Sequence, residues 1–249
     1  MLRAIDVSRA GMLRQGSQLD VRAHNIANVT TPGFRAFRAL LEGGEAGTPQ
    51  PGAPVPPLGG QVPTAAMFRQ GPIRETGVPT DLAIDGEGFF VVARPDGTQA
   101  YTRGGAFRRD AQGRLVDGAG NALQSVTLPD GVVGLRIAAG GQVLAVMADG
   151  RTQNAGQLQL ARFINPQGLL AIGDGVFVET AASGPVQPAP PGQDGVGVVR
   201  AGALEAANAD LADEMAGVLA AQRLYQLNTA SFRMADEMLR MAATLPGST

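Results

Sequence analysis

The chain has 249 residues, of which 35 are glycine and 17 are proline, while cysteine and tryptophan are absent. This composition favours many turns and short strands, and the length suffices for a sizeable core in one or two domains. The formal net charge of −2 argues against a nucleic-acid binder that relies on phosphate neutralisation. A chain without cysteine has neither a disulfide framework nor a thiolate metal site.

Residues 1–33 form the first predicted segment, with a helix over residues 2–28. Its apolar side chains recur at a seven-residue step, which is nearly two helical turns and places them along one side of the helix. The N-terminal stretch lacks the continuous apolar core of a secretory signal, and no run approaches the roughly 18 apolar residues of a membrane span. The stripe consists of Ile5, Met12, Leu19 and Ile26.

A dense cluster of turn-forming and amide residues follows this helix. Pro32 disfavours helical backbone at Thr31 and Gly33 permits a positive φ, so the chain is expected to turn here and to deliver Phe34 to an apolar surface. A fraying helix end and a specified corner both fit such a composition. The density of the cluster favours the corner. The predicted corner comprises Asn25, Asn28, Thr31, Gly33 and Phe34.

The segment from Ala23 to Arg35 resembles the N-terminal signature of the bacterial flagellar rod and hook proteins, whose pattern is roughly A-N-N-x-A-N-x-x-T-x-G-F/Y-K/R. His24 stands where the family has its first Asn, so the resemblance does not extend to the local hydrogen bond that this Asn side-chain amide makes in the family. The matching positions are Ala23, Asn25, Ala27, Asn28, Thr31, Gly33, Phe34 and Arg35.

Residues 34–66 are predicted to connect the first helix to the next domain. Within them, residues 43–63 contain 12 Gly or Pro among 21 residues, and Glu45 is the only charged side chain. Such a composition forms no packed core. A disordered linker is the favoured interpretation, and an extended polyproline-like strap along neighbouring molecules is the alternative.

Residues 67–200 are predicted to form an antiparallel β-rich domain of barrel or sandwich type. Two apolar runs, residues 88–94 and 98–103, flank a Pro-Asp-Gly turn in which Pro presets φ and Gly tolerates a positive φ, so a hairpin is expected. Further Asp-Gly pairs separate short apolar runs such as residues 142–147 and 156–164, and they indicate more tight turns.

The same family resemblance extends through this domain and into the C-terminal segment. In the β domain it is carried by residues 81–90, 101–107 and 179–184. Together the motifs are most like those of a distal-rod or closely related rod subunit, and they cover almost the whole chain except residues 43–63. The matching C-terminal residues are Gly202, Leu204, Glu205, Asn208, Glu214, Gln222, Arg223, Tyr225, Asn228 and Met238.

Residues 201–249 are predicted to contain a closing helix that opens at residues 202–208. This helix carries a second apolar stripe with a seven-residue step. Polar residues lie close to the stripe, at positions where a monomeric core helix more often has Leu or Val: Gln222, Asn228 and Asp236. Two interpretations stay open: an antiparallel helix pair that closes a globular domain, and a terminal coiled-coil module that packs against copies of itself. The stripe consists of Leu211, Val218, Tyr225, Phe232 and Leu239.

Residues suited to catalysis or metal binding are sparse. His24 is the only histidine and lies in the predicted corner, and Ser183 lacks the glycine spacing of a nucleophile elbow. The carboxylates Asp81, Asp85 and Glu87 are expected on different faces of a strand and turn. The acidic loops lack the alternating ligands and closing Glu of a calcium loop. We therefore expect neither an enzyme nor a cofactor or metal site.

The predicted fold is α+β, with paired terminal helices in a coiled-coil-like module and a central antiparallel β-rich domain. The resemblance implies a structural subunit of the flagellar basal-body rod that polymerises into a helical drive shaft and transmits torque. It implies assembly with copies of itself and with other rod or hook subunits, with ring proteins as further candidate partners. Neither nucleic-acid binding nor membrane insertion is expected. The two stripes are the predicted assembly interface.

The resemblance also implies a location in the periplasm-spanning rod, reached by flagellar type III export without a cleaved signal peptide. Two alternatives to the distal rod remain: a hook or proximal-rod subunit and, more distantly, a β-rich adhesin or carbohydrate-binding module. An adhesin typically exposes aromatic side chains, and this chain has two Tyr and no Trp.

Overall fold

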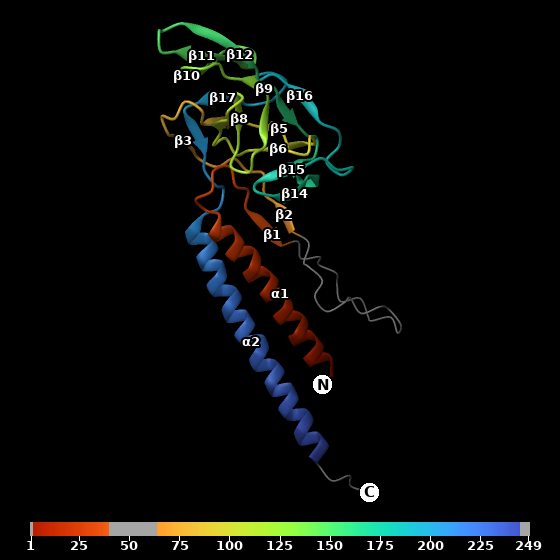
Figure 1. The fold of residues 1–249 in the computed structure, drawn as a ribbon. Helices are drawn as coiled ribbons and strands as arrows, with labels where there is room; N and C mark the ends of the chain where they lie inside the picture. Colours follow the sequence, from red (N-terminus) through yellow and green to blue (C-terminus); the bar gives the residue numbers. More distant parts are fainter. Residues whose placement is uncertain (1, 40–63, 245–249) are drawn as a thin grey trace. The chain divides into compact units, whose positions relative to one another are not determined.

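The computed structural model describes residues 2–39 and 64–244 (Figure 1). The Gly- and Pro-rich stretch at residues 43–63, predicted as a linker or strap, lies outside the described residues. The described chain is α+β, with a helix at each end and a large antiparallel β-rich region between them, so the predicted fold class is confirmed at this level.

The chain divides into two compact units, each assembled from segments that lie far apart in the sequence. Over the described residues, the helical unit comprises residues 2–27, 37–39, 64–65 and 210–244, and the β unit comprises residues 28–36 and 66–209. Both terminal helices therefore belong to one unit.

The helical unit consists mainly of α1 (Leu2–Ala27) and α2 (Leu211–Thr244), which run side by side in opposite directions (Figure 1). Asp210 caps α2, because its Oδ1 accepts hydrogen bonds from the backbone N–H groups of Ala212 at 2.8 Å and Asp213 at 3.2 Å. Strands β1 (Phe37–Ala39) and β2 (Thr64–Ala66) pair in a two-stranded sheet.

The closing helix begins later than the sequence predicted. It was expected to open at residues 202–208, but β18 (Ala203–Glu205) is a strand that pairs antiparallel with β3 (Ile73–Glu75), and α2 starts at Leu211. Gly202 has φ of +75°, which a helix does not accommodate, and it precedes this strand. Helical backbone at residues 203–205 would forfeit both the pairing with β3 and the burial of the Glu205 side chain.

The predicted hairpin is confirmed. Strand β5 (Phe89–Ala93) pairs antiparallel with β6 (Gln99–Thr102), with Phe90 opposite Thr102. The remaining strands of the β unit are β4 (Leu82–Asp85), β7 (Arg108–Arg109), β8 (Arg114–Val116), β9 (Ala122–Thr127), β10 (Val132–Ile137), β11 (Gln142–Met147), β12 (Thr152–Gln157), β13 (Leu160–Arg162), β14 (Leu170–Gly173), β15 (Val176–Val178), β16 (Gln187–Ala189) and β17 (Val198–Ala201).

Most of these strands join one antiparallel sheet. Over the described residues it contains 12 strands, with the path β10-β11-β12-β9-β5-β6-β15-β14 and with β13, β16, β7 and β8 attached beside it. Strands β17 and β4 form a separate pair. The runs at residues 142–147 and 156–164, predicted as strands, contain β11 and β13.

The core of the β unit lies around β5. Phe90 is fully buried and its ring meets that of Phe107 edge to face, with centroids 5.6 Å apart. Leu115, Leu160 and Ile84 are also fully buried and belong to the same apolar cluster. An aromatic pair of this kind adds specific ring contacts to the burial of apolar area.

Replacing Phe90 by Ala should destabilise the β unit by roughly 3–5 kcal/mol, because it removes a buried ring and leaves a cavity. Val133→Ala is the control, since Val133 is 58% exposed and should change stability little. Urea unfolding of the full chain measures both. Equal unfolding midpoints for the two variants would contradict this assignment of the core.

Candidate assembly interface

The seam between α1 and α2 is built from small and polar side chains. Its most buried residues are Ser8, Gln15 and Asn25 on α1, and Glu214, Ala221 and Ala235 on α2. Apart from Asn25, their spacings are seven or a multiple of seven, as in helices wound beside one another. Among the side chains that the structure describes, no Leu, Ile, Val, Met or aromatic residue of either helix is buried to this degree.

Two glycines leave room at this seam for polar side chains of the other helix. A Cβ atom on Gly11 would lie 2.7 Å from Nδ2 of Asn228, and a Cβ atom on Gly217 would collide with the guanidinium of Arg22. Gly16, also on α1, has open space where its Cβ atom would be. Gly11 and Gly217 are therefore tied to the seam, whereas Gly16 is not.

Polar bonds cross the seam at one end of the pair. Nη1 of Arg22 lies 2.9 Å from Oε2 of Glu214, and Nδ2 of Asn25 donates to Oε1 of the same carboxylate at 2.8 Å. Asn25 also pairs with the backbone of Phe37, donating to its oxygen at 2.9 Å and accepting from its N–H at 2.8 Å. Glu214 is thereby held by two donors, which compensates its burial.

The two predicted stripes lie beside the seam. On α1 all four stripe residues are half-buried, and the Sδ atom of Met12 lies 3.5 Å from Oγ1 of Thr229. On α2, Leu211 and Tyr225 are exposed, at 45% and 43%, and the other three are half-buried. The half-buried stripe residues are Ile5, Met12, Leu19 and Ile26 on α1, and Val218, Phe232 and Leu239 on α2.

Both stripes fall on the same side of the helix pair. Met12 and Leu19 follow Ser8 and Gln15 by four residues, and Tyr225 follows Ala221 by four, which turns each stripe about 40° from the seam. α1 and α2 run in opposite directions (Figure 1), so equal rotations from the seam bring the two stripes to one flank. We call this surface, formed by both stripes, the Tyr225 flank.

The remaining predicted corner residues lie in the β unit. The N–H of Thr31 donates to the Asn28 oxygen at 3.0 Å in a turn, and Phe34 is buried. Gly33 has φ of +71°, and a Cβ atom there would lie 2.4 Å from the backbone nitrogen of Gly104. The predicted turn is confirmed, and only glycine fits its tightest position.

A buried ion network follows this turn. The carboxylate of Glu205 lies 2.8 Å from Nη1 of Arg35 and 3.3 Å from Nη1 of Arg103, and it accepts a 2.7 Å hydrogen bond from the N–H of Gly71. The Glu205 side chain is 0% exposed. Its backbone oxygen accepts from the N–H of Gly33 at 2.7 Å. The local sequence gives no signal for this network, because its members come from three distant segments.

Two buried arginines share the single carboxylate. Burial lowers the pKa of Arg103 to about 10, while Glu205 opposes that shift and Arg35 adds to it. Arg103 also donates to the backbone oxygen of Gly86 at 2.7 Å. Within the described residues, the Nε atoms of both arginines are buried without a hydrogen-bond partner. The network is thus indispensable once formed, since removing the acid would leave two buried cations together.

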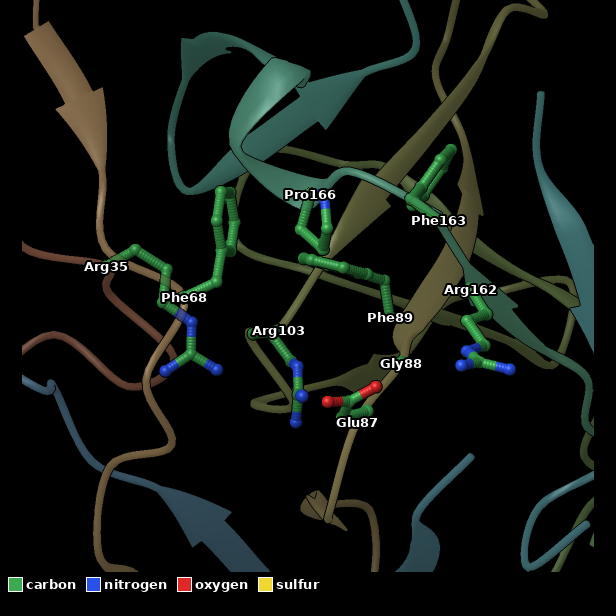
Figure 2. A pocket seen from close by; sticks show the side chains of 9 residues that line it. All are labelled: Arg35, Phe68, Glu87, Gly88, Phe89, Arg103, Arg162, Phe163 and Pro166. Atoms are coloured by element: carbon green, nitrogen blue, oxygen red, sulfur yellow. The ribbon is translucent and has the colours of Figure 1, made fainter. Parts of the chain in front are cut away.

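Beside this network the surface has a hollow of about 60 Å³ (Figure 2). The close view shows Arg103 at its centre, with Glu87 between Arg103 and Arg162, and aromatic rings around them. A hollow of this size holds about two water molecules. Its lining consists of Arg35, Phe68, Glu87, Gly88, Phe89, Arg103, Arg162, Phe163 and Pro166.

The side chains that were considered as catalytic candidates form hydrogen bonds or ion pairs with neighbouring residues. Asp81 accepts a 2.6 Å hydrogen bond from Oγ1 of Thr76, and Asp85 pairs with Arg200 at 2.6 Å. Ser183 is fully buried and donates to the Thr180 oxygen at 2.9 Å. The part of the chain that the structure describes holds no group of three or more His, Asp or Glu arranged to bind a metal.

Two family models match the chain. The "Flagellar hook protein FlgE/F/G D1 domain" matches residues 83–145, and the "Flagellar basal body rod FlgEFG protein C-terminal" matches residues 200–245. The chain is also 37% identical to the flagellar basal-body rod protein FlgG of Borreliella burgdorferi, over 98% of this chain and 99% of that protein. This chain belongs to the FlgG family of flagellar basal-body rod proteins.

Other members of the FlgG family are similar in sequence to this chain over the same length. Those of Caulobacter vibrioides and Bacillus subtilis are 36% and 34% identical, each over 98% of this chain and 99% of their own. The hook protein FlgE of Helicobacter mustelae is 38% identical, but over 50% of this chain and 30% of its own length. The resemblance stated from the sequence is confirmed, and the chain is a structural subunit of the rod. Of the helices described, none is long and apolar enough to cross a membrane.

In this member of the FlgG family, Glu205→Gln should lower the free energy of unfolding by roughly 3–5 kcal/mol, because it leaves Arg35 and Arg103 buried without their counter-charge. The matched control is Asp130→Asn, which removes an exposed partner of Arg109 and should change little. Chemical denaturation monitored by circular dichroism compares them. A Glu205→Gln chain as stable as its control would rule out the buried network as a stabilising element.

The seam can be tested with two glycines of the same helix. Gly16→Ala should stabilise α1 by about 1 kcal/mol through helix propensity alone. Gly11→Ala gains the same propensity but must displace Asn228, so its net benefit should be smaller or negative. Amide hydrogen exchange along α1 reports both effects. Equal protection in the two variants would mean that α1 and α2 do not approach at Gly11.

Proposed function

We propose that the chain is a distal-rod subunit that polymerises through its helical unit into a helical drive shaft and transmits torque. One observation carries the proposal: a polar seam already joins α1 to α2, and apolar side chains remain on the outside of the pair. Leu211 is 45% exposed and Tyr225 43%, and the other residues of the two stripes are half-buried. Apolar surface gathered on one side of a molecule is typical of interaction sites.

The proposed interface is the Tyr225 flank. Its residues are partly exposed in the single chain and can bury more of their surface against a neighbour. Burying a large apolar side chain contributes roughly 1.5–3 kcal/mol, so several half-exposed ones together support a stable contact. The interface comprises Ile5, Met12, Leu19, Ile26, Leu211, Val218, Tyr225, Phe232 and Leu239.

The finer features of this proposal follow from the family and from the helix pair. We infer that α1 and α2 wind as a coiled coil, in keeping with the seven-residue spacing of their seam. Partners are copies of the chain, other rod and hook subunits, and surrounding ring proteins. The subunit acts in the periplasm, reaches it by type III export without a cleaved signal peptide, and catalyses no reaction.

The four-part division predicted from the sequence remains part of the proposal. In it, residues 1–33 and 201–249 form the inner assembly module, residues 34–66 connect, and residues 67–200 form the β domain. The corner at residues 25–34 orients the chain where it leaves α1. A hook subunit is the less favoured alternative, because the hook likeness covers half of the chain while the FlgG likeness covers nearly all of it.

Electron microscopy of the purified chain at high concentration tests the proposal, since a head-to-tail contact that does not close gives a helical polymer. Tyr225→Asp should abolish polymers, because it places a charge on the proposed interface, while the β unit keeps its melting transition. Gln226→Asp is the control, because the next residue turns about 100° away. Polymers from Tyr225→Asp chains would place that flank in solvent.

A further inference from the structure

We propose that the β unit binds one small monovalent anion, with chloride as the simplest example, in the hollow beside the buried ion network (Figure 2). The hollow is lined by three guanidinium groups that come from separate parts of the chain. Arg35 follows the turn at Gly33, Arg103 follows β6, and Arg162 ends β13. All of them belong to the β unit, so the site is independent of the proposed assembly interface.

The charges around the hollow do not balance. Two carboxylates, those of Glu205 and Glu87, face the three guanidinium groups, so the cluster carries one net positive charge. Glu205 already serves the two buried guanidinium groups. Arg162 is held by a backbone group instead: its Nη1 donates to the Asp194 oxygen at 3.0 Å, and no carboxylate of the described residues pairs with it. An uncompensated positive charge beside a hollow attracts an anion.

Two N–H donors beside the hollow lack an acceptor. The side chains of Arg35 and Arg103 are 1% and 6% exposed, and among the described residues their Nε atoms are buried without a hydrogen-bond partner. Their terminal nitrogens bond Glu205 and the backbone oxygens of Arg69 and Gly86. A buried charged donor without an acceptor is costly. An anion in the hollow supplies negative charge beside these groups.

The size and the walls of the hollow favour a small anion. Its volume of about 60 Å³ corresponds to about two water molecules, and a chloride ion is little larger than one. The Phe89 ring packs edge to face against Phe68 and Phe163, with centroids 5.5 and 5.8 Å apart, and the guanidinium carbon of Arg103 lies 5.6 Å from the Phe89 centroid. Apolar walls lower the local dielectric and strengthen the attraction between guanidinium groups and an anion.

Glu87 opposes the binding of an anion at this site. Its side chain lies between Arg103 and Arg162 (Figure 2). Burial lowers the pKa of Arg103 and the charge of Glu87 opposes that shift, so the two groups interact. A carboxylate in this position repels a bound anion. Removal of its charge should therefore strengthen anion binding, whereas removal of the Arg162 charge should weaken it.

Thermal unfolding of the full chain tests the site, with chloride replacing gluconate at one constant ionic strength. General screening is then the same throughout, and gluconate has too many atoms for the hollow. A ligand that binds only the folded state raises the melting temperature as its concentration rises. We expect the melting temperature of the β unit, followed by circular dichroism, to rise by roughly 3–5 °C for each tenfold increase in chloride above the dissociation constant.

Three substitutions separate the site from a general salt effect. Arg162→Gln leaves the cluster neutral and should abolish most of the chloride-dependent rise. Glu87→Gln gives the cluster a second net positive charge and should lower the chloride concentration at half of the rise several-fold. The matched control is Arg151→Gln, which removes the same charge from a side chain that is 85% exposed, pairs with Asp149 and does not line the hollow. It should respond as the parent chain does.

NMR of the chloride nucleus gives a direct readout, because exchange with a protein site broadens its signal. The broadening should be lost with Arg162→Gln and kept with Arg151→Gln. Equal melting temperatures in the two salts, for both the parent and Glu87→Gln, would overturn the inference. Equal chloride responses of Arg162→Gln and Arg151→Gln would show an adventitious ion only and overturn it too. If Arg162→Gln does not fold in gluconate, the comparison of Glu87→Gln with the parent decides.

Discussion

The carboxylate of Glu205 is the group on which the β unit most depends. It lies fully buried between Arg35 and Arg103, and its own backbone oxygen holds the N–H of Gly33. One residue near the end of the chain thereby fixes a turn near the beginning and a strand end in the middle. Taking an acid and two guanidinium groups out of water is costly, and the cost is offset only when all three are present. The turn at Gly33, the strand β18 and the ion network therefore depend on one another for their stability.

In the helical unit, small and polar side chains lie at the contact between the helices and large apolar side chains lie outside it. Its seam contains Ser8, Gln15, Glu214 and alanines, while Leu and Met side chains lie outside. Small residues bring two backbones close, and an ion pair with Arg22 and a hydrogen bond from Asn25 satisfy Glu214, while Oε1 of Gln15 is buried without a hydrogen-bond partner among the described residues. Such a seam leaves the apolar surface of both helices available to other molecules. For a rod subunit, we propose that this separates the contact that shapes the subunit from the contacts that join subunits.

The two family models match only part of the chain, whereas the FlgG relatives match nearly all of it. The matched models cover residues 83–145 and 200–245, and the corner around Gly33 lies outside both. Glu205, inside the second range, nevertheless contacts the corner directly, so the corner is tied to the matched region by a buried charge. The apolar side chains of α2 lie within that same range. The family model matches the whole helix and does not select one of its sides.

The sequence by itself determined the features set by local rules: a helix at each end from apolar periodicity, the turn at Gly33 from its neighbours, and the hairpin of β5 and β6 from a Pro-Asp-Gly turn. Tertiary structure decided what local rules leave open. Residues 203–205 became a strand because Glu205 has partners 102 and 170 positions away. The seam of the helix pair formed on small and polar residues, not on the apolar stripes, because Glu214 pairs with Arg22 and Asn25 there and Gly11 and Gly217 leave room for the side chains of Asn228 and Arg22. Several sets of residues on each helix share the seven-residue period, and only packing in three dimensions selects among them.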